Sequence, residues 1–318
     1  MSEKKIIAVI GSTGHQGGGL CRAILDDASG EFACRAITRD AGKASAQALA
    51  AKGAEVVEGN LDDVESLKKA FAGAYGVFGV TNFWEHFSAE KEKAQAKNIA
   101  DAAKAAGVKH VIWSTLEDTR ALMAPDDKRM PFLQEKYRVP HFDAKAEADA
   151  YFADLPVTYL LTTFYWDNLY SFGLAPKKGA DGNYSWAFPM GDKKLAGIAA
   201  EDIGKIAYAI FKAGDKYIGK SVGIYSEALT IDEMGAKLSK ALDLPPIHYH
   251  AASADEYRGY GFPGADEMGN MFQYYRDFTD EFLDLRDVEL ARSLNPSMQT
   301  FDQFVDAHKD QIKAAIGI

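Results

Sequence analysis

The sequence predicts an α/β fold: a Rossmann-type doubly wound parallel sheet with a smaller mixed α/β C-terminal part. Short runs rich in Val, Ile and Phe alternate with Ala-rich amphipathic stretches through the first half of the chain, and parallel strands need such helical crossovers. A glycine-rich loop follows the first apolar run directly. After about residue 165 the alternation fades and aromatic residues become frequent.

The apolar runs have the length and composition of strands that are buried on both faces of a sheet. Strands are expected at Ile6–Ile10, Ala33–Thr38, Glu55–Glu58, Gly76–Val80, Val108–Ser114 and Val157–Leu161. Helices are expected between them, at Gly17–Asp26, Ala44–Lys52, Val64–Ala72, Ala89–Ala106 and His141–Ala153. The charged, proline-containing stretch Arg120–Arg138 interrupts this alternation, and we expect it to be a surface loop.

The change in pattern divides the chain into two parts. Residues 1–164 are expected to form a dinucleotide-binding Rossmann domain, and residues 165–318 a smaller domain for substrate or partner, from which the chain can return to the first. Capping boxes, in which Ser or Thr precedes Glu or Gln by three residues, predict helix starts in the second part. They occur at Thr230–Glu233, Ser253–Glu256 and Thr300–Gln303.

The composition excludes several classes of protein. The chain has 318 residues, 47% of them hydrophobic, and a formal net charge of -10; direct nucleic-acid binding, which needs a positive surface, is not expected. No stretch has the apolar length of a membrane span or the pattern of a signal peptide. Cys21 and Cys34 are the only cysteines, so we expect reduced thiols and a cytoplasmic protein, with the nucleus as a further location. A monomer or a homodimer is expected.

The glycine loop has the spacing G-x-x-G-x-x-G, with glycines at Gly11, Gly14 and Gly17. Small residues there let the backbone turn tightly and approach a pyrophosphate, while the following helix directs its N–H groups at the anion. The loop stands after the first strand and opens the first helix, which is the context that a dinucleotide-binding loop requires. A purely structural glycine turn fits that context less well.

The end of the second predicted strand bears on the choice of cofactor. Arg39 stands at the turn, and Lys43 lies one helical turn further on. Cations there suit a ribose 2′-phosphate, because a guanidinium can bind it through two hydrogen bonds. This favours NADP(H), while the acidic Asp40 keeps NAD(H) as the alternative.

Further residues follow the ends of the next strands, where ligands bind in open α/β sheets. Asn60 and Leu61 follow the third strand, where an adenine ring is expected. The fourth strand is followed by Thr81, Asn82 and Phe83. Together these positions predict a binding crevice along the carboxyl edge of the sheet.

The segment HFDAK stands where a reductase of this fold usually has Tyr-x-x-x-Lys. Lys145 can still hold the nicotinamide ribose, and His141 lies on the same helix face. The reductase Tyr donates a proton to the substrate carbonyl, which His141 could do near neutral pH, but we interpret His141 as a residue that packs or caps locally. Tyr165 is the better candidate for a replacement acid. Tyr137 lies two helical turns from Lys145 and fits poorly.

No metal site is predicted. His248 and His250 alternate as metal ligands can, but no acidic residue or cysteine accompanies them, and a strand surface is the expected explanation. The sequence also lacks a G-x-S-x-G elbow, so an α/β-hydrolase is not expected. The aromatic run Phe164–Trp166 and the segment Gly261–Phe272 are candidates for the wall of a pocket over the nicotinamide, with core packing as the alternative.

Several segments resemble the NmrA-like proteins, which belong to the atypical short-chain dehydrogenase/reductase superfamily. They are GSTGHQGG, TRDAGK, VTNFWE, HFDAK, FYWDNL and GFPGADEMGNMF. The resemblance covers nearly the whole chain, apart from an apparent insertion around residues 121–136, and is strongest to the animal branch described as NADPH sensors (HSCARG-like). It implies dinucleotide binding by a redox-responsive regulator rather than a dehydrogenase.

The resemblance also implies where the cofactor binds. It places the pyrophosphate at the glycine loop, close to Thr13 and Gln16, and the 2′-phosphate at Arg39 and Lys43. A lysine that contacts the cofactor in the sensor branch aligns with Ala94 here, although lysines flank that position. The residues implied on the nicotinamide side are Thr81, Asn82, Phe83, Lys145, Tyr165 and Asn168.

Two functions follow from these patterns. The first is an NADP(H)-binding regulator without dehydrogenase activity, whose conformation a regulatory protein partner recognises. A ligand can shift that conformation only by binding two conformations unequally. The second is an NADPH-dependent reductase of quinones, carbonyls or aromatic metabolites, with a small aromatic substrate bound by the second half. The missing reductase Tyr favours the first, and a scaffold with a vestigial cofactor site is a third interpretation.

Overall fold

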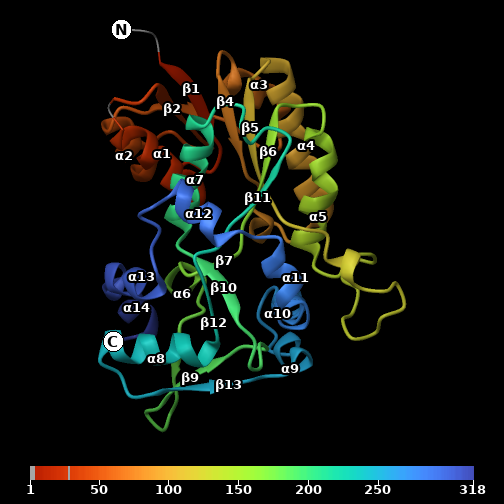
Figure 1. The fold of residues 1–318 in the computed structure, drawn as a ribbon, viewed down its shortest axis with the longest axis vertical. Coiled ribbons are helices and arrows are strands. Elements are labelled where there is room, and N and C mark those ends of the chain that lie inside the picture. The colour runs from red at the N-terminus through yellow and green to blue at the C-terminus, as the bar shows by residue number, and fades with distance from the viewer. Residues whose placement is uncertain (1–3, 28) are drawn as a thin grey trace.

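The computed structural model describes residues 4–27 and 29–318, and its centre is a parallel sheet (Figure 1). The strands of this sheet are β1 Lys5–Val9, β2 Phe32–Thr38, β3 Glu55–Glu58, β4 Gly76–Gly79, β5 His110–Thr115, β6 Val157–Leu161 and β11 Ser221–Gly223. Their order is β11-β6-β5-β4-β1-β2-β3, and every adjacent pair is parallel. The predicted Rossmann-type doubly wound sheet is therefore confirmed.

Helices cover both faces of this sheet. On one face lie α1 His15–Asp26, α2 Ala44–Ala51 and α7 Ala200–Lys212; on the other lie α3 Val64–Phe71, α4 Ala89–Ala106 and α5 Pro140–Ala148. Alternate strand residues point to the two layers, so that Ile7 packs with the first group and Ala8 with the second. The helix predicted to run from His141 to Ala153 is shorter, because its last turn tightens into a 3-10 helix at Asp149–Phe152.

The C-terminal part contains two small sheets, in the orders β12-β10-β7 and β13-β9-β8. Their strands are β7 Phe164–Tyr165, β8 Lys177–Lys178, β9 Tyr184–Ala187, β10 Leu195–Ile198, β12 Glu227–Leu229 and β13 Ile247–His250. The helices around them are α6 Asn168–Ser171, α8 Ile231–Leu242, α9 Ala254–Arg258, α10 Ala265–Asp277, α11 Thr279–Asp284, α12 Val288–Leu294, α13 Phe301–Ala307 and α14 Lys309–Ile316. Most of the aromatic residues of this part form one buried cluster.

The chain crosses back from the C-terminal part to the central sheet. β11 extends that sheet beside β6, and α7 packs on α1. The helix contact is close: a Cβ at Gly204 would lie 2.1 Å from the backbone nitrogen of Leu20. β11 escaped prediction because three residues are too few to show a strand pattern.

Two of the predicted capping boxes are complete, at Thr230 and Thr300. At Ser253 only the hydroxyl bond forms, because the carboxylate of Glu256 lies 2.8 Å from His250 instead. Within the described residues, no cluster of His, Cys, Asp and Glu side chains suits a metal ion.

The stretch Arg120–Arg138 differs from the expected surface loop, because its C-terminal end is buried. Tyr137 is 1% exposed and Arg138 2%. The guanidinium of Arg138 donates to the carbonyl oxygens of Asp127 and Met130 within the same stretch, and several such acceptors allow a guanidinium to be buried without a carboxylate partner.

Cys21 and Cys34 are buried free thiols, as expected. None of the helices in the described part of the chain combines the length and apolar character that crossing a membrane requires.

Candidate functional site

A cavity of about 960 Å³ opens at the carboxyl ends of the central strands, and every residue predicted to bind the cofactor lines it. It lies where the strand order reverses, between β1 and β4, which is where ligands bind in this fold. That these residues bind a dinucleotide stays a prediction. They are Gly11, Thr13, Gly14, Gln16, Gly17, Arg39, Lys43, Asn60, Leu61, Thr81, Asn82, Phe83, Lys145, Tyr165 and Asn168.

The glycine loop has the geometry that a pyrophosphate requires. Gly11 has a φ of 64°, which favours glycine, and a Cβ at Gly17 would lie 2.5 Å from the carbonyl oxygens of Ile10 and Gly11. α1 then begins without a side-chain cap and without an acidic residue in its first turn. Its N-terminal N–H groups and dipole are thus available to an anion, so the loop fits the phosphates of the expected cofactor.

An exposed ion pair lies at the end of the cavity where the adenosine is predicted to bind, which we call the adenosine end. Arg39, at the end of β2, donates to both carboxylate oxygens of Glu85, at 2.6 and 3.1 Å. Asn82 donates to the same carboxylate. The nearby Asp40 accepts from the N–H of Gly42 and does not line the cavity, so the acidic residue that an NAD site needs is used in the turn.

The end of the cavity where the nicotinamide is predicted to bind, which we call the nicotinamide end, contains a buried ion pair that the sequence did not reveal. Lys145 lies 2.9 Å from Glu92 and donates to the hydroxyl of Thr81 at 2.8 Å, while that hydroxyl donates to Glu92 at 2.5 Å. Glu92 is fully buried, whereas Glu90, two residues earlier on α4, is exposed. In the charged sequence AEKEKAQAK nothing local distinguishes the two carboxylates.

Burial and ion pairing compete at this end of the cavity. Burial by itself would raise the pKa of Glu92, but Lys145, His86 and Thr81 outweigh it and lower the pKa to about 2. At Asp149 burial prevails and raises the pKa to about 6, although the side chains of Thr115 and Trp113 donate to its carboxylate. The two carboxyl groups thus differ because only one has a cation in contact.

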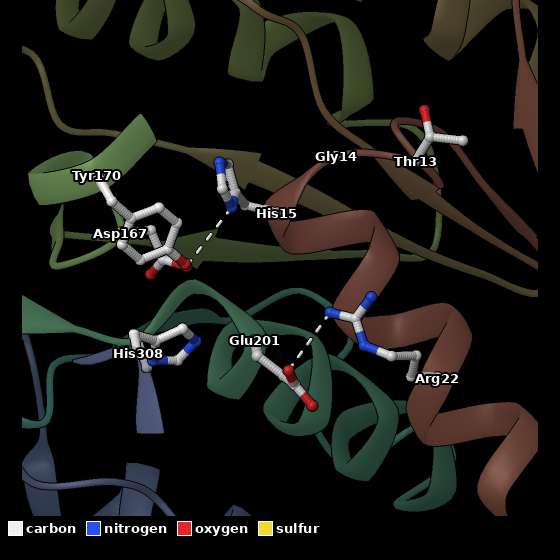
Figure 2. Close-up of a pocket in the computed structure, with 9 residues that line it drawn as sticks. Thr13, Gly14, His15, Arg22, Asp167, Tyr170, Glu201 and His308 are labelled. Atoms are coloured by element: carbon white, nitrogen blue, oxygen red, sulfur yellow. Dashed lines mark hydrogen bonds and ion pairs between the residues drawn. The ribbon is translucent and has the colours of Figure 1, made fainter. Parts of the chain in front are cut away.

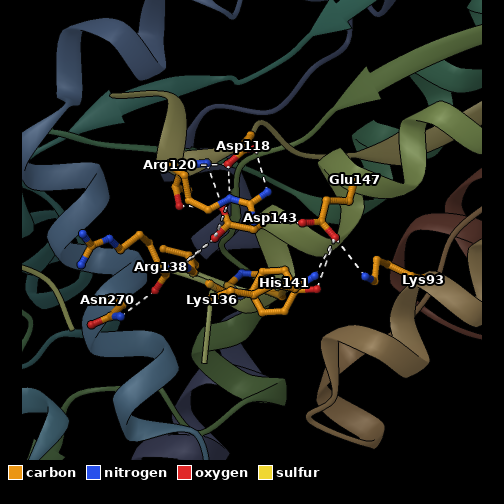
Figure 3. A network of polar contacts seen from close by, with 12 residues as sticks. Lys93, Asp118, Arg120, Lys136, Arg138, His141, Asp143, Glu147 and Asn270 are labelled. Atoms are coloured by element: carbon orange, nitrogen blue, oxygen red, sulfur yellow. Dashed lines mark hydrogen bonds and ion pairs between the residues drawn. The ribbon is translucent and has the colours of Figure 1, made fainter. Parts of the chain in front are cut away.

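The helix that carries HFDAK is fixed at its N-terminus by a polar network (Figure 3). The carboxylate of Asp143, fully buried, accepts the backbone N–H groups of Thr119, Arg138 and Val139. Asn270, on α10, donates to the carbonyl oxygen of Arg138 at 2.6 Å. The first turn of α5 is therefore held in place from both the preceding loop and the C-terminal part.

His141 is buried, as expected, but its partner is distant in sequence rather than local. Its Nδ1 contacts a carboxylate oxygen of Glu267, and its backbone N–H donates to the same oxygen at 2.8 Å. The ring packs against Trp84 and Phe142, with centroids 5.0 and 4.8 Å away, and lines the cavity. Glu267 belongs to the GFPGADEMGNMF segment, to which the sequence assigned no polar role.

Tyr165 and Tyr137, the two tyrosines considered as acids, have different surroundings. Tyr165 lines the cavity; its hydroxyl accepts from Gln16 at 2.5 Å and lies 3.2 Å from the hydroxyl of Thr162. Burial raises its pKa to about 12, more than these contacts lower it. Tyr137 donates to Glu90, outside the cavity lining. The lysines that flank Ala94 also lie outside it: Lys93 pairs with Glu90 and Glu147, and Lys97 with Asp101.

Beyond the nicotinamide end the cavity becomes apolar. Side chains from distant segments converge there, and the indole of Trp84 meets the ring of Phe172 with centroids 5.1 Å apart. The segment Gly261–Phe272 contributes to this wall, as one alternative of the sequence analysis had it, whereas Trp166 belongs to the core. We call these residues the apolar chamber: Trp84, Leu116, Phe142, Phe164, Phe172, Leu174, Met268, Met271 and Tyr275.

A smaller cavity of about 270 Å³ lies beside the glycine loop (Figure 2). It shares Thr13, Gly14 and His15 with the large cavity. His15 faces Asp167 at 3.5 Å and Arg22 faces Glu201 at 3.4 Å across it. Its charged groups are thus paired with one another.

The chain matches the model of one protein family over most of its length. The model described as the NmrA-like family matches residues 3–305. The chain belongs to the NmrA-like family. Among its relatives is the NmrA-like family domain-containing oxidoreductase FrzB of Cladobotryum sp, which is 28% identical over 285 residues, covering 85% of this chain and 83% of FrzB.

Solved structures share the fold across the whole chain. The negative transcriptional regulator NmrA in complex with NADP has a TM-score of 0.78 at 24% identity, covering 100% of this chain and 99% of that one. The Citrobacter sp. triphenylmethane reductase complexed with NADP(H) has a TM-score of 0.72 at 20% identity, covering 98% and 99%. The NmrA-like resemblance is thus confirmed. FrzB and a second relative, lnbB of Aspergillus flavus, are fungal oxidoreductases, and these comparisons do not show the expected similarity to the animal sensor branch.

Proposed function

We propose that this NmrA-like protein is an NADPH-dependent reductase of small aromatic acceptors. One observation carries the proposal: the cavity predicted to hold the cofactor continues into the apolar chamber. At about 960 Å³ it lies near the upper end of ligand pockets, which span roughly 300–1,000 Å³. A protein that only sensed the cofactor would not need an apolar space beyond the nicotinamide end.

The residues fit NADP(H) in a consistent order along the cavity. The glycine loop would hold the pyrophosphate, Arg39 and Lys43 the 2′-phosphate, and Lys145 the nicotinamide ribose. When bound, the cofactor would supply a hydride at the border of the apolar chamber. The buried partner Glu92 fixes the Lys145 ammonium in place before the cofactor arrives, which reduces the cost of ordering it. The chamber walls would exclude water and orient a planar acceptor.

The test is NADPH oxidation by the purified protein with substoichiometric cofactor. The acceptors are 9,10-phenanthrenequinone, 4-nitrobenzaldehyde and the cationic dye malachite green. Gly14→Val serves as the control, because a Cβ there meets only the carbonyl oxygen of Gly11, at 3.3 Å, and the larger side chain would obstruct the phosphate site. Turnover of any acceptor that disappears in Gly14→Val supports the proposal. Tight NADPH binding without oxidation of any acceptor would reject it.

A redox-responsive regulator is the second candidate, and the Arg39–Glu85 pair favours it. This pair joins the loop after β2 to the segment after β4, and a 2′-phosphate that binds Arg39 would compete with Glu85. Occupancy by NADP(H) would then loosen residues 83–87. The regulator would be favoured if NADPH, but not NADH, increased the rate of hydrogen exchange in residues 83–87 and the protein reduced none of the acceptors.

A further inference from the structure

His141 and Glu267 form a buried pair, and His141 lines the cavity where the apolar chamber begins. Resting on the proposed reductase function, we infer that His141 donates its Nε2 proton to the carbonyl oxygen of the substrate, and that Glu267 is its positioning residue. The substrate class that this arrangement serves is aromatic aldehydes and ketones.

The contacts of Glu267 determine how the imidazole is presented. One carboxylate oxygen of Glu267 is shared between Nδ1 and the backbone N–H of His141, and the two residues are 3% and 6% exposed. A carboxylate in this position fixes the orientation of the ring and accepts a hydrogen bond from Nδ1–H. The shared backbone contact ties this orientation to the first turn of α5.

The other ring nitrogen is left for the substrate. Among residues 4–27 and 29–318, no hydrogen bond engages Nε2 of His141, and Nε2 is not one of the fully buried side-chain atoms without a partner. It is therefore accessible, and the residue lines the cavity. Lys145 lies four residues further on the same helix face, so that the imidazole occupies the position of the reductase Tyr.

Two other proton-bearing groups at this border, Lys145 and Tyr165, are already engaged. Lys145 is held by Glu92 and Thr81. The hydroxyl of Tyr165 takes the amide of Gln16, and its pKa is raised to about 12 by burial, which makes it a poor acid at neutral pH. His141 is the group whose second nitrogen is unused.

The reaction balances as one hydride and one proton. As the carbonyl carbon receives the hydride, the C=O π pair moves to oxygen, and that oxygen takes the proton from Nε2 of a doubly protonated His141. The neutral imidazole then regains a proton from water, so that carbonyl, NADPH and H⁺ yield alcohol and NADP⁺. A triarylmethane cation, by contrast, accepts a hydride at carbon and needs no proton.

This difference between acceptors gives the test. In His141→Phe the ratio of 4-nitrobenzaldehyde reduction to malachite green reduction should fall about 100-fold, the usual contribution of a general acid. His141→Asn should behave in the same way, and NADPH binding by tryptophan quenching reports whether each variant is folded. An unchanged ratio, or a wild type that reduces the dye but no aldehyde, overturns the inference and leaves the reductase proposal standing. A wild type that reduces neither the quinone, the aldehyde nor the dye rejects both.

The role of Glu267 is tested without turnover, by NMR of the His141 imidazole in the cofactor-free protein. Wild type should show a downfield Nδ1–H resonance, which is absent in His141→Phe and moves upfield in Glu267→Gln. The exposed His250–Glu256 pair provides the matched control, and Glu256→Gln should leave this resonance and the aldehyde-to-dye ratio unchanged. A resonance that Glu267→Gln does not move would remove Glu267 from the inference.

Discussion

The two ends of the large cavity each carry an ion pair, and the pairs differ in burial rather than in geometry. Arg39 and Glu85 meet at 2.6 Å with side chains 65% and 46% exposed, whereas Lys145 and Glu92 meet at 2.9 Å with side chains 10% and 0% exposed. An exposed pair contributes about 0–1 kcal/mol and can open, but a buried charge cannot lose its partner without a large penalty. The adenosine end is therefore adaptable, and the nicotinamide end is preformed.

The supporting structure explains this difference. Arg39 follows the end of β2, and Glu85 lies in the 3-10 helix Phe83–Glu85, so neither is fixed by packing. Glu92 and Lys145 lie on α4 and α5, which pack against each other. A preformed nicotinamide end suits chemistry that needs fixed positions.

The largest effect that would test the comparison is the loss of Lys145. Lys145→Met leaves the buried carboxylate of Glu92 without its cation and should lower the free energy of unfolding by about 3–5 kcal/mol at pH 7. Urea denaturation followed by circular dichroism measures this change.

The double variant Lys145→Met/Glu92→Gln is the control, because it removes the buried charge together with its partner. It should recover most of the lost stability without recovering cofactor binding. If the single variant is as stable as wild type, water reaches Glu92 and the nicotinamide end is not preformed.

The two ends of the cavity also differ in how much of their structure could be predicted from the sequence. The glycine loop, Arg39 and the residues after β3 and β4 were predicted because each lies at the carboxyl end of a strand, and strand order in this fold is regular. The parallel sheet was predicted from the alternation of apolar runs with amphipathic stretches along the sequence. These features depend on residues that are close in sequence.

The buried pairs escaped prediction because their members are far apart. Lys145 meets Glu92 across 53 residues of chain, and His141 meets Glu267 across 126. Nothing in a run of charged residues on α4 distinguishes the one carboxylate that is buried. The GFPGADEMGNMF segment was noticed for its resemblance and as a candidate pocket wall, but not for its carboxylate.

A second, smaller effect probes the preformed end through pH. Burial raises the pKa of Asp149 to about 6, above its ordinary 3.8, so its ionised form costs stability above pH 6 and that cost disappears as the pH falls from 6 to 3.8. Asp149→Asn keeps an oxygen that can accept from Trp113 and Thr115. It should raise the unfolding free energy by about 1–3 kcal/mol at pH 8 and have little effect near pH 4.

Urea titrations at the two pH values measure this difference. Asp154→Asn is the matched control, since its side chain is 87% exposed and the same change should have no effect. A stabilisation that is equal at both pH values would mean that packing, not charge, limits Asp149.

The smallest effect concerns the adaptable end. Glu85→Gln removes the charge that competes for Arg39, so NADPH should bind more tightly by up to about fivefold, the limit set by an exposed ion pair, while NADH affinity stays the same. Isothermal titration with both cofactors measures the two affinities. Glu58→Gln controls for the general loss of a negative charge, because that exposed carboxylate lies at the end of β3 and makes no ion pair with Arg39. If Glu85→Gln increases the affinity for NADH as much as the affinity for NADPH, Arg39 does not bind the 2′-phosphate. The adenosine end is then no more adaptable than the nicotinamide end.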